Sequence, residues 1–358
     1  MKSKIAIVYG TRPEFLKVYP LILEAKRREI DVLTINTGQH SDILSDMEGI
    51  FEFTPDYKLK VQNVHFSNAE LLAKLIDKVD QIIKLEEIDV FIAQGDTFTV
   101  LAAAMISFLS KKKFYHVEAG LRTDNIHLPF PEEFNRRVVT LVSQMNFAPT
   151  ELSKANLLKE HISDEKILVT GNTIIDLLCY VIDRYHITLE RSNVVFVTAH
   201  RRENIGQRLD EICKTIQELA VENPNINFYW SLHPNPEVRK LVFASLDKNQ
   251  SNIIFLEPLD YVETVRLMAR SLLLISDSGG IQEEAPTLNK KILILRQETE
   301  RPEVLECGSG VLVGSERSKI KFEFYKELNN FDQNRQFNNP FGDGNAASLI
   351  FDTLASNE

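Results

Sequence analysis

Residues 5–13, IAIVYGTRP, show the pattern that decides the fold: five apolar or aromatic residues run directly into a glycine and polar side chains. Five other apolar runs end in a similar way; they are Val90–Ala93 before Gly95-Asp96, Phe114–Val117 before Glu118, Val194–Val197 before Thr198-Ala199-His200, Phe228–Leu232 before His233, and Leu272–Ile275 before Asp277-Ser278-Gly279. Short continuous runs of β-branched and aromatic residues are typical of buried parallel strands. In open α/β sheets, ligands bind outside the carboxyl ends of the strands. The sequence therefore predicts a cleft lined by carboxylates, imidazoles and a glycine turn.

Helical patterns alternate with these runs. Leu21–Glu29 is predicted to be a helix with a charged outer face, and Asn68–Leu85 carries apolar residues at a period near 3.6. Strand–helix alternation of this kind predicts βαβ units and a parallel sheet. The pattern weakens between residues 170 and 192 and restarts at Val194, which places a domain junction in that interval.

Bulk composition narrows the functional class. The chain has 358 residues, long enough for two α/β domains, and is 44% hydrophobic and 26% charged. Its net charge of −10 argues against broad nucleic-acid binding, although a few local cations can still hold an anionic ligand. The three cysteines form no CxxC motif, and no apolar stretch is long enough for a signal peptide or membrane span. We therefore expect a cytoplasmic protein without a metal site.

In the first half, two strand ends carry candidate groups. The turn Gly10-Thr11-Arg12-Pro13 feeds a helix, which makes it an anion site by geometry, and Arg12 and Lys17 supply positive charge. A plain βα turn explains it about equally well. Asp96 follows the next run as a candidate site carboxylate, but it could instead be the N-cap of a helix over Thr99–Leu109.

Glu118 and Glu132 are the other candidate carboxylates of this half. Glu118 ends a predicted strand beside Gly120, which allows close approach of the backbone to a ligand. Glu132 begins a helix after a loop containing two prolines and aromatic residues. Glu132 and Arg136 are four residues apart, so a surface ion pair is the alternative to a positioned catalytic pair.

In the second half, His200-Arg201-Arg202 places three basic groups at one strand end, which favours an anion over a merely solvated loop. Ser278-Gly279-Gly280 joins a predicted strand to a helix, and glycine amides at such a turn cradle phosphate. Glu284, one turn into that helix, is placed to accept the two hydroxyls of a ribose.

Taken together, these motifs resemble the non-hydrolysing UDP-N-acetylglucosamine 2-epimerase family. The matching strings run along nearly the whole chain: GTRPEFLK at 10–17, GDTFT at 95–99, HVEAGLRT at 116–123, PEEFNR at 131–136, FAPTELSKANLL at 147–158, GNTIIDLL at 171–178, HRREN at 200–204, SGGIQEEAP at 278–286, TERPE at 299–303 and NPFGDG at 339–344. Two segments, Ser41-Asp42-Ile43 after TGQH and residues 63–67, depart from the family's usual sequence in a region that holds a second, activating UDP-GlcNAc in bacterial members.

The resemblance implies an α/β fold with two Rossmann-like domains facing a cleft, the glycosyltransferase-B architecture. Residues 1–170 would form the N-terminal domain with the catalytic carboxylates, and 171–344 the C-terminal, UDP-binding domain. The last helix, within 345–358, would pack back on the first domain. The family also implies a homodimer, a UDP-amino sugar as the bound partner, and neither a cofactor nor nucleic-acid or membrane binding.

Carried over by matching position, the family's catalytic group falls on Asp96, Glu118, Glu132 and His200. The substrate-binding group falls on Arg12, Lys17, Arg136, His233, Ser278, Gly279, Gly280 and Glu284. The implied reaction is C2 epimerisation of UDP-GlcNAc to UDP-ManNAc. A related 6-deoxy or diacetamido UDP-sugar, a hydrolysing epimerase, a glycosyltransferase with a UDP-sugar donor and a silent nucleotide-sugar sensor are the alternatives.

Overall fold

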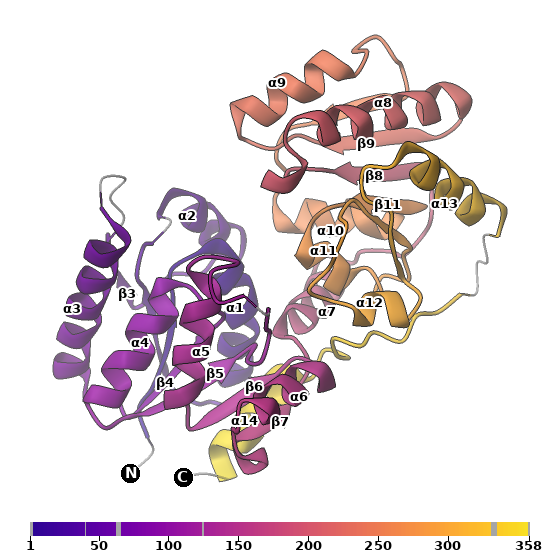
Figure 1. The fold of residues 1–358 in the computed structure, drawn as a ribbon. Coiled ribbons are helices and arrows are strands. Elements are labelled where there is room, and N and C mark those ends of the chain that lie inside the picture. Colours follow the sequence, from indigo (N-terminus) through magenta and orange to yellow (C-terminus); the bar gives the residue numbers. More distant parts are fainter. Residues whose placement is uncertain (1–2, 40, 62–65, 124, 331–334, 357–358) are drawn as a thin grey trace. The chain divides into compact units, whose positions relative to one another are not determined.

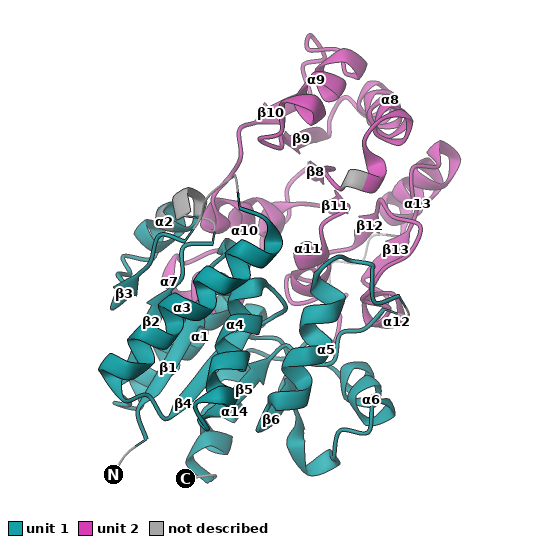
Figure 2. Ribbon diagram, turned by 60° about the vertical axis from the view of Figure 1, so that its left-hand side comes forward, with its two compact units in different colours: residues 1–177, 341–358 teal, residues 178–340 magenta. Residues whose placement is uncertain are grey.

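The computed structural model describes residues 3–39, 41–61, 66–123, 125–330 and 335–356. Asn63-Val64-His65, part of one segment where the family pattern changes, and His40, directly before the other, lie outside these residues, as do the side chains of Ser41-Asp42-Ile43. The chain forms two compact units (Figure 2). Unit 1 contains the residues up to Leu177 together with those from Phe341 onward, and unit 2 spans Leu178–Pro340. Residues 171–177 and 341–344 therefore belong to unit 1.

Unit 1 is built on a seven-stranded parallel sheet in the order β3-β2-β1-β4-β5-β6-β7. Its strands are β1 (Ile5–Tyr9), β2 (Val32–Asn36), β3 (Tyr57–Lys58), β4 (Val90–Gln94), β5 (Lys113–Val117), β6 (Met145–Ala148) and β7 (Ile167–Val169). The three apolar runs predicted as strands in this half are β1, β4 and β5, and they lie side by side. The strand order reverses between β1 and β4, so the switch point of the sheet lies between the Gly10 and Gly95 loops.

Helices cover both faces of this sheet (Figure 1). They are α1 (Arg12–Arg27), α2 (Ser41–Ile50), α3 (Asn68–Glu86), α4 (Phe98–Leu109), α5 (Glu132–Val142), α6 (Glu151–Lys159), α7 (Thr173–Arg184, which continues into unit 2) and α14 (Ala346–Ser356), with a 3₁₀ turn η1 (Asp164–Lys166). Apolar side chains of α3, α4 and α5 pack on β1, β4 and β5 to form the core of one face. The C-terminal helix α14 packs on α1, where Arg28 pairs with Asp352 at 2.6 Å.

The first helix differs from the prediction. The helix expected over Leu21–Glu29 is the second half of α1, which begins at Arg12 and ends at Arg27. A capping box between Thr11 and Glu14, with a proline in the first turn, starts the helix early. Glu29 adopts a left-handed φ of 57° beyond its end. The predicted helix over 68–85 is confirmed as α3.

Unit 2 repeats the same plan with six parallel strands in the order β10-β9-β8-β11-β12-β13. The strands are β8 (Val194–Thr198), β9 (Asn227–Ser231), β10 (Ile253–Leu256), β11 (Leu273–Ser276), β12 (Ile292–Ile294) and β13 (Gly310–Leu312). The helices are η2 (Arg202–Asn204), α8 (Gln207–Glu222), α9 (Pro236–Ser245), α10 (Tyr261–Arg270), α11 (Gly279–Glu284), α12 (Glu303–Glu306) and α13 (Arg317–Asn329).

The order reverses between β8 and β11, so the switch point of unit 2 lies between the His200 and Ser278 loops. Two Rossmann-like units are thus confirmed. Across the described ranges, none of the helices combines the length and apolar character that a membrane crossing requires.

Candidate active site

The turn after β1 requires glycine at position 10. A Cβ on Gly10 would lie 2.2 Å from Thr37 Oγ1 and 2.3 Å from Thr99 Oγ1. These two hydroxyls hydrogen-bond each other at 2.8 Å, so a side chain at position 10 would break the contact between the loops after β2 and β4. Arg12 begins α1 and is exposed, and no hydrogen bond or ion pair to another described residue holds its guanidinium.

Glu14 links the loops after β1 and β4. Its carboxylate is buried, accepts the backbone N–H groups of Gly10 and Thr11 at 2.8 Å, and accepts the Thr97 hydroxyl at 2.5 Å. Burial raises the pKa of Glu14 from 4.5 to about 7, against the hydrogen bonds that lower it. The two loops that carry Arg12 and Asp96 are therefore fixed to one buried carboxyl group.

We predict that Glu14→Gln changes the pH dependence of unit 1 stability. Because the folded pKa lies above the unfolded one, the folded state holds its proton longer, and Glu14 lowers stability as pH rises from about 4.5 to about 7. A shift of this size corresponds to roughly 3 kcal/mol. Glutamine removes this loss while keeping an oxygen for the two amides, so the variant should gain stability relative to the native chain between pH 4.5 and 8. Urea unfolding followed by circular dichroism measures this gain.

Glu70→Gln is the matched control. Glu70 occupies the same capping-box position on α3, but it is exposed, and hydrogen bonds from the backbone and side chain of Ser67 lower its pKa. Its stabilising contribution is present above its unfolded pKa and lost in acid, so Glu70→Gln should lose stability at neutral pH. Parallel stability curves for native chain and Glu14→Gln across this pH range would contradict the prediction.

Asp96 is not the N-cap of α4. The cap is Thr97, whose hydroxyl accepts the Thr99 N–H at 3.1 Å, so the alternative interpretation of Asp96 is wrong. The Asp96 carboxylate instead receives Arg136 Nη2 at 2.5 Å and Nε at 3.1 Å. Asn135 donates to the Asp96 carbonyl at 2.8 Å, so α5 holds both the backbone and the side chain of Asp96.

The predicted surface pair between Glu132 and Arg136 does not form. Arg136 pairs with Asp96 and, at 3.3 Å, with the fully buried Glu133. Glu132 is half-buried at the first position of α5, and no described residue forms a hydrogen bond or ion pair with its carboxylate. Of the two acids in this first turn, Glu133 is therefore structural and Glu132 is available for chemistry.

Glu118 follows β5 in a left-handed backbone conformation with φ of 64°, which is unusual for a residue with a side chain. Its side chain is 9% exposed and accepts hydrogen bonds from Lys17 and, at 2.8 Å, from Asn172. Gly95 donates to the Val117 carbonyl at 3.0 Å, so Asp96 and Glu118 leave neighbouring strands. Unit 1 thus brings Arg12, Lys17, Asp96, Glu118, Glu132 and Arg136 to the carboxyl edge of one sheet.

In unit 2 the strand ends are organised by Asp277, which is fully buried. Its Oδ2 accepts the backbone N–H groups of His200 and Arg201 at 2.8 Å and the Asn204 amide at 2.9 Å. His200 stacks on His233 with ring centroids 5.0 Å apart and planes 9° from parallel. The two histidines predicted from separate strand ends are therefore brought together. The side chain of Arg202 lies outside the described part of the structure.

The glycine pair after β11 lies beside an arginine. A Cβ on Gly279 would be 2.8 Å from Arg301 Nη1, so the absence of a side chain lets the guanidinium lie against the first turn of α11. Arg301 Nε pairs with the buried Glu283 at 2.6 Å. Glu284 is buried, and its Oε1 accepts the Tyr261 hydroxyl at 2.6 Å. Ser278, Gly279, Gly280 and Glu284 thus share the carboxyl edge of unit 2 with His200 and His233.

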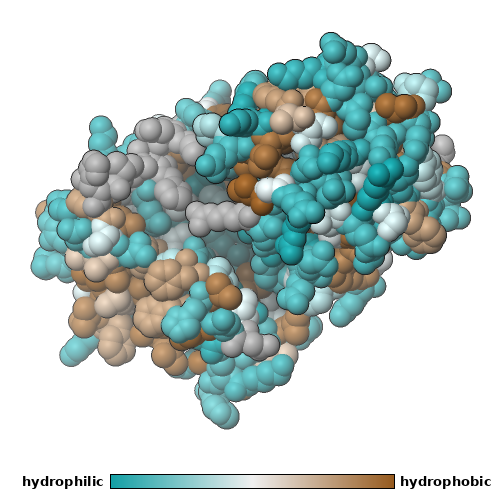
Figure 3. Space-filling model, turned by 45° about the horizontal axis from the view of Figure 1, so that its top comes forward, coloured by the Kyte–Doolittle hydropathy of each residue, from teal (hydrophilic) through white to brown (hydrophobic). Residues whose placement is uncertain are grey.

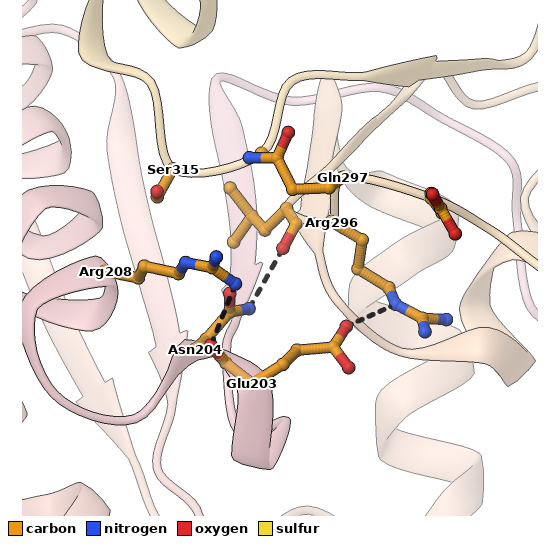
Figure 4. A pocket seen from close by; sticks show the side chains of 9 residues that line it. Glu203, Asn204, Arg208, Arg296, Gln297 and Ser315 are labelled. Carbon is orange, nitrogen blue, oxygen red and sulfur yellow. Dashed lines mark hydrogen bonds and ion pairs between the residues drawn. The ribbon is translucent and has the colours of Figure 1, made fainter. Parts of the chain in front are cut away.

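A cavity of about 280 Å³ opens beside this edge, and Figure 4 shows side chains from η2, α8 and the loops after β12 and β13 around it. Arg296 pairs with Glu203 at 2.7 Å and with Glu300 at 2.5 Å, while Asn204 donates to the Leu295 carbonyl at 2.9 Å. None of the predicted site residues is among the residues that line it.

These networks also contain residues that were not predicted as site residues, among them Glu14, Asn172, Asp277 and Arg301. Each lies inside a motif quoted from the sequence, but its partner is distant in the chain, as for Asp277 and Asn204, 73 residues apart. Asp277 carried a sequence signal, because a charged residue directly after a buried strand needs a partner, and so did Glu14, which stands at the capping-box spacing from Thr11.

The family model described as UDP-N-acetylglucosamine 2-epimerase matches residues 23–355. The UDP-N-acetylglucosamine 2-epimerase of Neisseria meningitidis serogroup A is 40% identical over 373 aligned positions, covering 99% of this chain and 100% of the relative.

Solved structures agree with this match. The crystal structure of UDP-GlcNAc 2-epimerase from Neisseria meningitidis bound to UDP-GlcNAc superposes with a TM-score of 0.90 at 39% identity, covering 99% of this chain and 100% of that one. The Methanocaldococcus jannaschii UDP-GlcNAc 2-epimerase in complex with UDP-GlcNAc and UDP gives a TM-score of 0.82 at 33% identity, with 99% of each chain covered. With its two Rossmann-like units and this nearly full-length match, the chain belongs to the UDP-N-acetylglucosamine 2-epimerase family.

Proposed function

We propose that the chain catalyses the non-hydrolysing epimerisation of UDP-GlcNAc at C2, giving UDP-ManNAc. The observation that carries the proposal is the carboxyl edge of unit 1: Asp96 and Glu118 follow the paired strands β4 and β5, and Asp96 is held by Arg136 of α5 instead of capping α4. Family membership and the names of the relatives support the same substrate.

The chemistry explains why several acids are needed. The C2 proton of an N-acetyl sugar is not next to a carbonyl, so direct abstraction is very hard. When the C1–O bond breaks and UDP leaves with the bonding electrons, C1 gains oxocarbenium character and the C2 proton becomes acidic. Its removal forms the C1–C2 double bond of a 2-acetamidoglucal. Re-addition of UDP to C1, with protonation of C2 from the other face, completes the inversion.

Each step is assigned to a group of this chain. Asp96 and Glu132 transfer the C2 proton on opposite faces of the ring, and Glu118 positions or electrostatically tunes them. His200 and the neighbouring arginines stabilise or protonate the departing diphosphate. Arg136 supports the catalytic group by holding Asp96. The remaining substrate-binding residues hold the nucleotide; they are Arg12, Lys17, His233, Ser278, Gly279, Gly280 and Glu284. The scheme uses no metal and no redox cofactor.

Turnover in D2O tests the function. Incubation with UDP-GlcNAc should place deuterium at C2 of the recovered UDP-sugar and produce UDP-ManNAc, because the proton passes through a carboxylate that exchanges with solvent. Mass spectrometry and proton NMR follow both products. A glycosyltransferase would leave C2 unlabelled, and a hydrolysing enzyme would release stoichiometric free N-acetylmannosamine, so either result would refute the proposal. UDP-linked 6-deoxy and diacetamido sugars in parallel identify the preferred sugar.

We further propose that the chain is a homodimer, as the family implies. Support comes from unit 1, where Leu85, Phe108, Leu109 and Leu141 are between 65% and 73% exposed at the carboxyl ends of α3, α4 and α5. Figure 3 shows hydrophobic side chains gathered on the surface of this unit. Sedimentation equilibrium should give twice the mass of the chain, and the monomer mass would refute the dimer.

The cysteines of the chain bear on the cellular compartment of the protein. We propose a cytoplasmic location, supported by the thiols Cys179, Cys213 and Cys307, which form no disulfide among the described residues. Cell fractionation with an antibody to the chain tests this, and recovery outside the cytoplasmic fraction would refute it.

A further inference from the structure

Asn172 lies where the two chain segments that connect the units meet. The chain leaves unit 1 within α7, after Leu177, and returns at Phe341. The Asn172 backbone N–H donates to the Phe341 carbonyl at 2.6 Å. The neighbouring glycines of the two segments are also close, because a Cβ on Gly171 would be 3.0 Å from Gly342 Cα. The outgoing and returning segments are therefore in direct backbone contact on the unit 1 side.

A second contact holds the same two segments together. Asp176, in the first turns of α7, accepts the backbone N–H groups of Ala346 and Ala347 at 3.3 and 2.8 Å, so it caps α14. Burial raises the pKa of Asp176 to about 6. Asn172 and the start of α7 are therefore both hydrogen-bonded to the returning segment.

The side chain of Asn172 connects this junction to Glu118. It is 3% exposed, and its Nδ2 donates to Glu118 Oε2 at 2.8 Å. Its Oδ1 accepts the Ile174 N–H at 3.1 Å, which fixes the amide orientation, because a flipped amide would place its donor against that N–H. The amide can therefore only donate toward Glu118.

Hydrogen bonds from two side chains hold Glu118 in its conformation. Its left-handed backbone is strained, and Lys17 and Asn172 both donate to Oε2. Lys17 approaches from α1, on the body of unit 1, whereas Asn172 approaches from the connection. Asn172 therefore links Glu118 to the contact between the outgoing and returning segments.

We propose that Asn172 is a positioning residue: its amide holds the Glu118 carboxylate in place for proton transfer and ties it to the contact between the two connecting segments. The inference deepens the proposed function and rests on it for its kinetic consequence. The contact itself between Asn172 and Glu118 can be tested without turnover.

The test compares Asn172→Ala and Asn172→Asp. Aspartate keeps the shape and the oxygen that accepts the Ile174 N–H, but it removes the donor and puts a second carboxylate beside Glu118. A purely structural capping role predicts that Asn172→Asp behaves like the native chain. A positioning role predicts the order native > Asn172→Ala > Asn172→Asp for the rate of C2 deuterium incorporation into UDP-GlcNAc. We expect losses of roughly 10- to 100-fold, with the UDP affinity from calorimetry within about twofold.

Asn249→Asp is the control for charge, because Asn249 is exposed in a turn of unit 2, outside the connecting segments, and should leave the exchange rate unchanged. An unfolding cycle with Glu118→Ala tests the contact: the shifts in urea midpoint from Asn172→Ala and Glu118→Ala should be non-additive. Exchange by Asn172→Asp at the native rate, or additive shifts in the cycle, would overturn the inference. If the native chain shows no exchange with UDP-GlcNAc, the proposed function fails, and the cycle alone decides on Asn172.

Discussion

Asp96→Asn should lower the rate of C2 exchange by about 10³-fold or more, while UDP still binds. General acid–base groups contribute roughly 10²- to 10⁴-fold to rate, and an amide of the same shape cannot take up or deliver the proton. Asparagine still offers an oxygen to Arg136, and Asn135 still binds the backbone carbonyl, so the loop keeps its position. The loss should therefore appear in turnover and not in folding.

Two measurements separate these effects: deuterium incorporation at C2 of UDP-GlcNAc, and UDP affinity by titration calorimetry. Asp89→Asn is the matched control, because Asp89 precedes the same strand at its other end, where it accepts the Lys4 backbone N–H at 3.1 Å. It makes the same chemical change on β4 outside the site. Near-native exchange by Asp96→Asn would remove Asp96 from the mechanism.

The strands could be predicted because each of them is a short apolar run that is contiguous in the sequence. All six apolar runs are strands, and their alignment in two parallel sheets follows from βαβ connections. Helix boundaries were harder to predict from the sequence, because they depend on the capping interactions at the helix ends. The capping box of Thr11 and Glu14 moved the start of α1 nine residues ahead of Leu21, the residue at which the prediction began.

For the candidate site, the sequence indicated which strand ends carry its residues, and the family resemblance supplied the roles that we propose for them. Predictions from sequence spacing failed where a side chain pairs with a residue distant in the chain instead of with a nearby one. Arg136 pairs with Asp96, 40 residues away, instead of with Glu132, four residues away. Thr97 caps α4 in place of Asp96, whose carboxylate pairs with Arg136. The contact between Glu118 and Asn172 joins positions 54 residues apart and has no periodic signature.

Asp277→Ala should destabilise unit 2 and weaken UDP binding together. The substitution removes the acceptor of the partly buried N–H groups of His200 and Arg201, and the acceptor of one of the two hydrogen bonds that the buried Asn204 amide donates. Each unsatisfied buried donor costs about 1–3 kcal/mol, so we expect a loss of about 3–5 kcal/mol, large for a single substitution. Because the same bonds fix the His200 loop, the UDP affinity should fall by at least about tenfold.

Trp230, the single tryptophan of the chain, makes the loss of stability measurable. It is buried in β9, so its fluorescence reports the unfolding of unit 2. Asp247→Ala is the matched control: Asp247 accepts the Asn249 N–H at 2.9 Å in an exposed turn and should shift the urea midpoint little. Asp277→Asn retains an acceptor oxygen for the three donors, so it should lie between the native chain and Asp277→Ala. A native unfolding midpoint for Asp277→Ala would show that the His200 loop is held by other contacts, and Asp277 would lose its role as the organiser of this sheet edge.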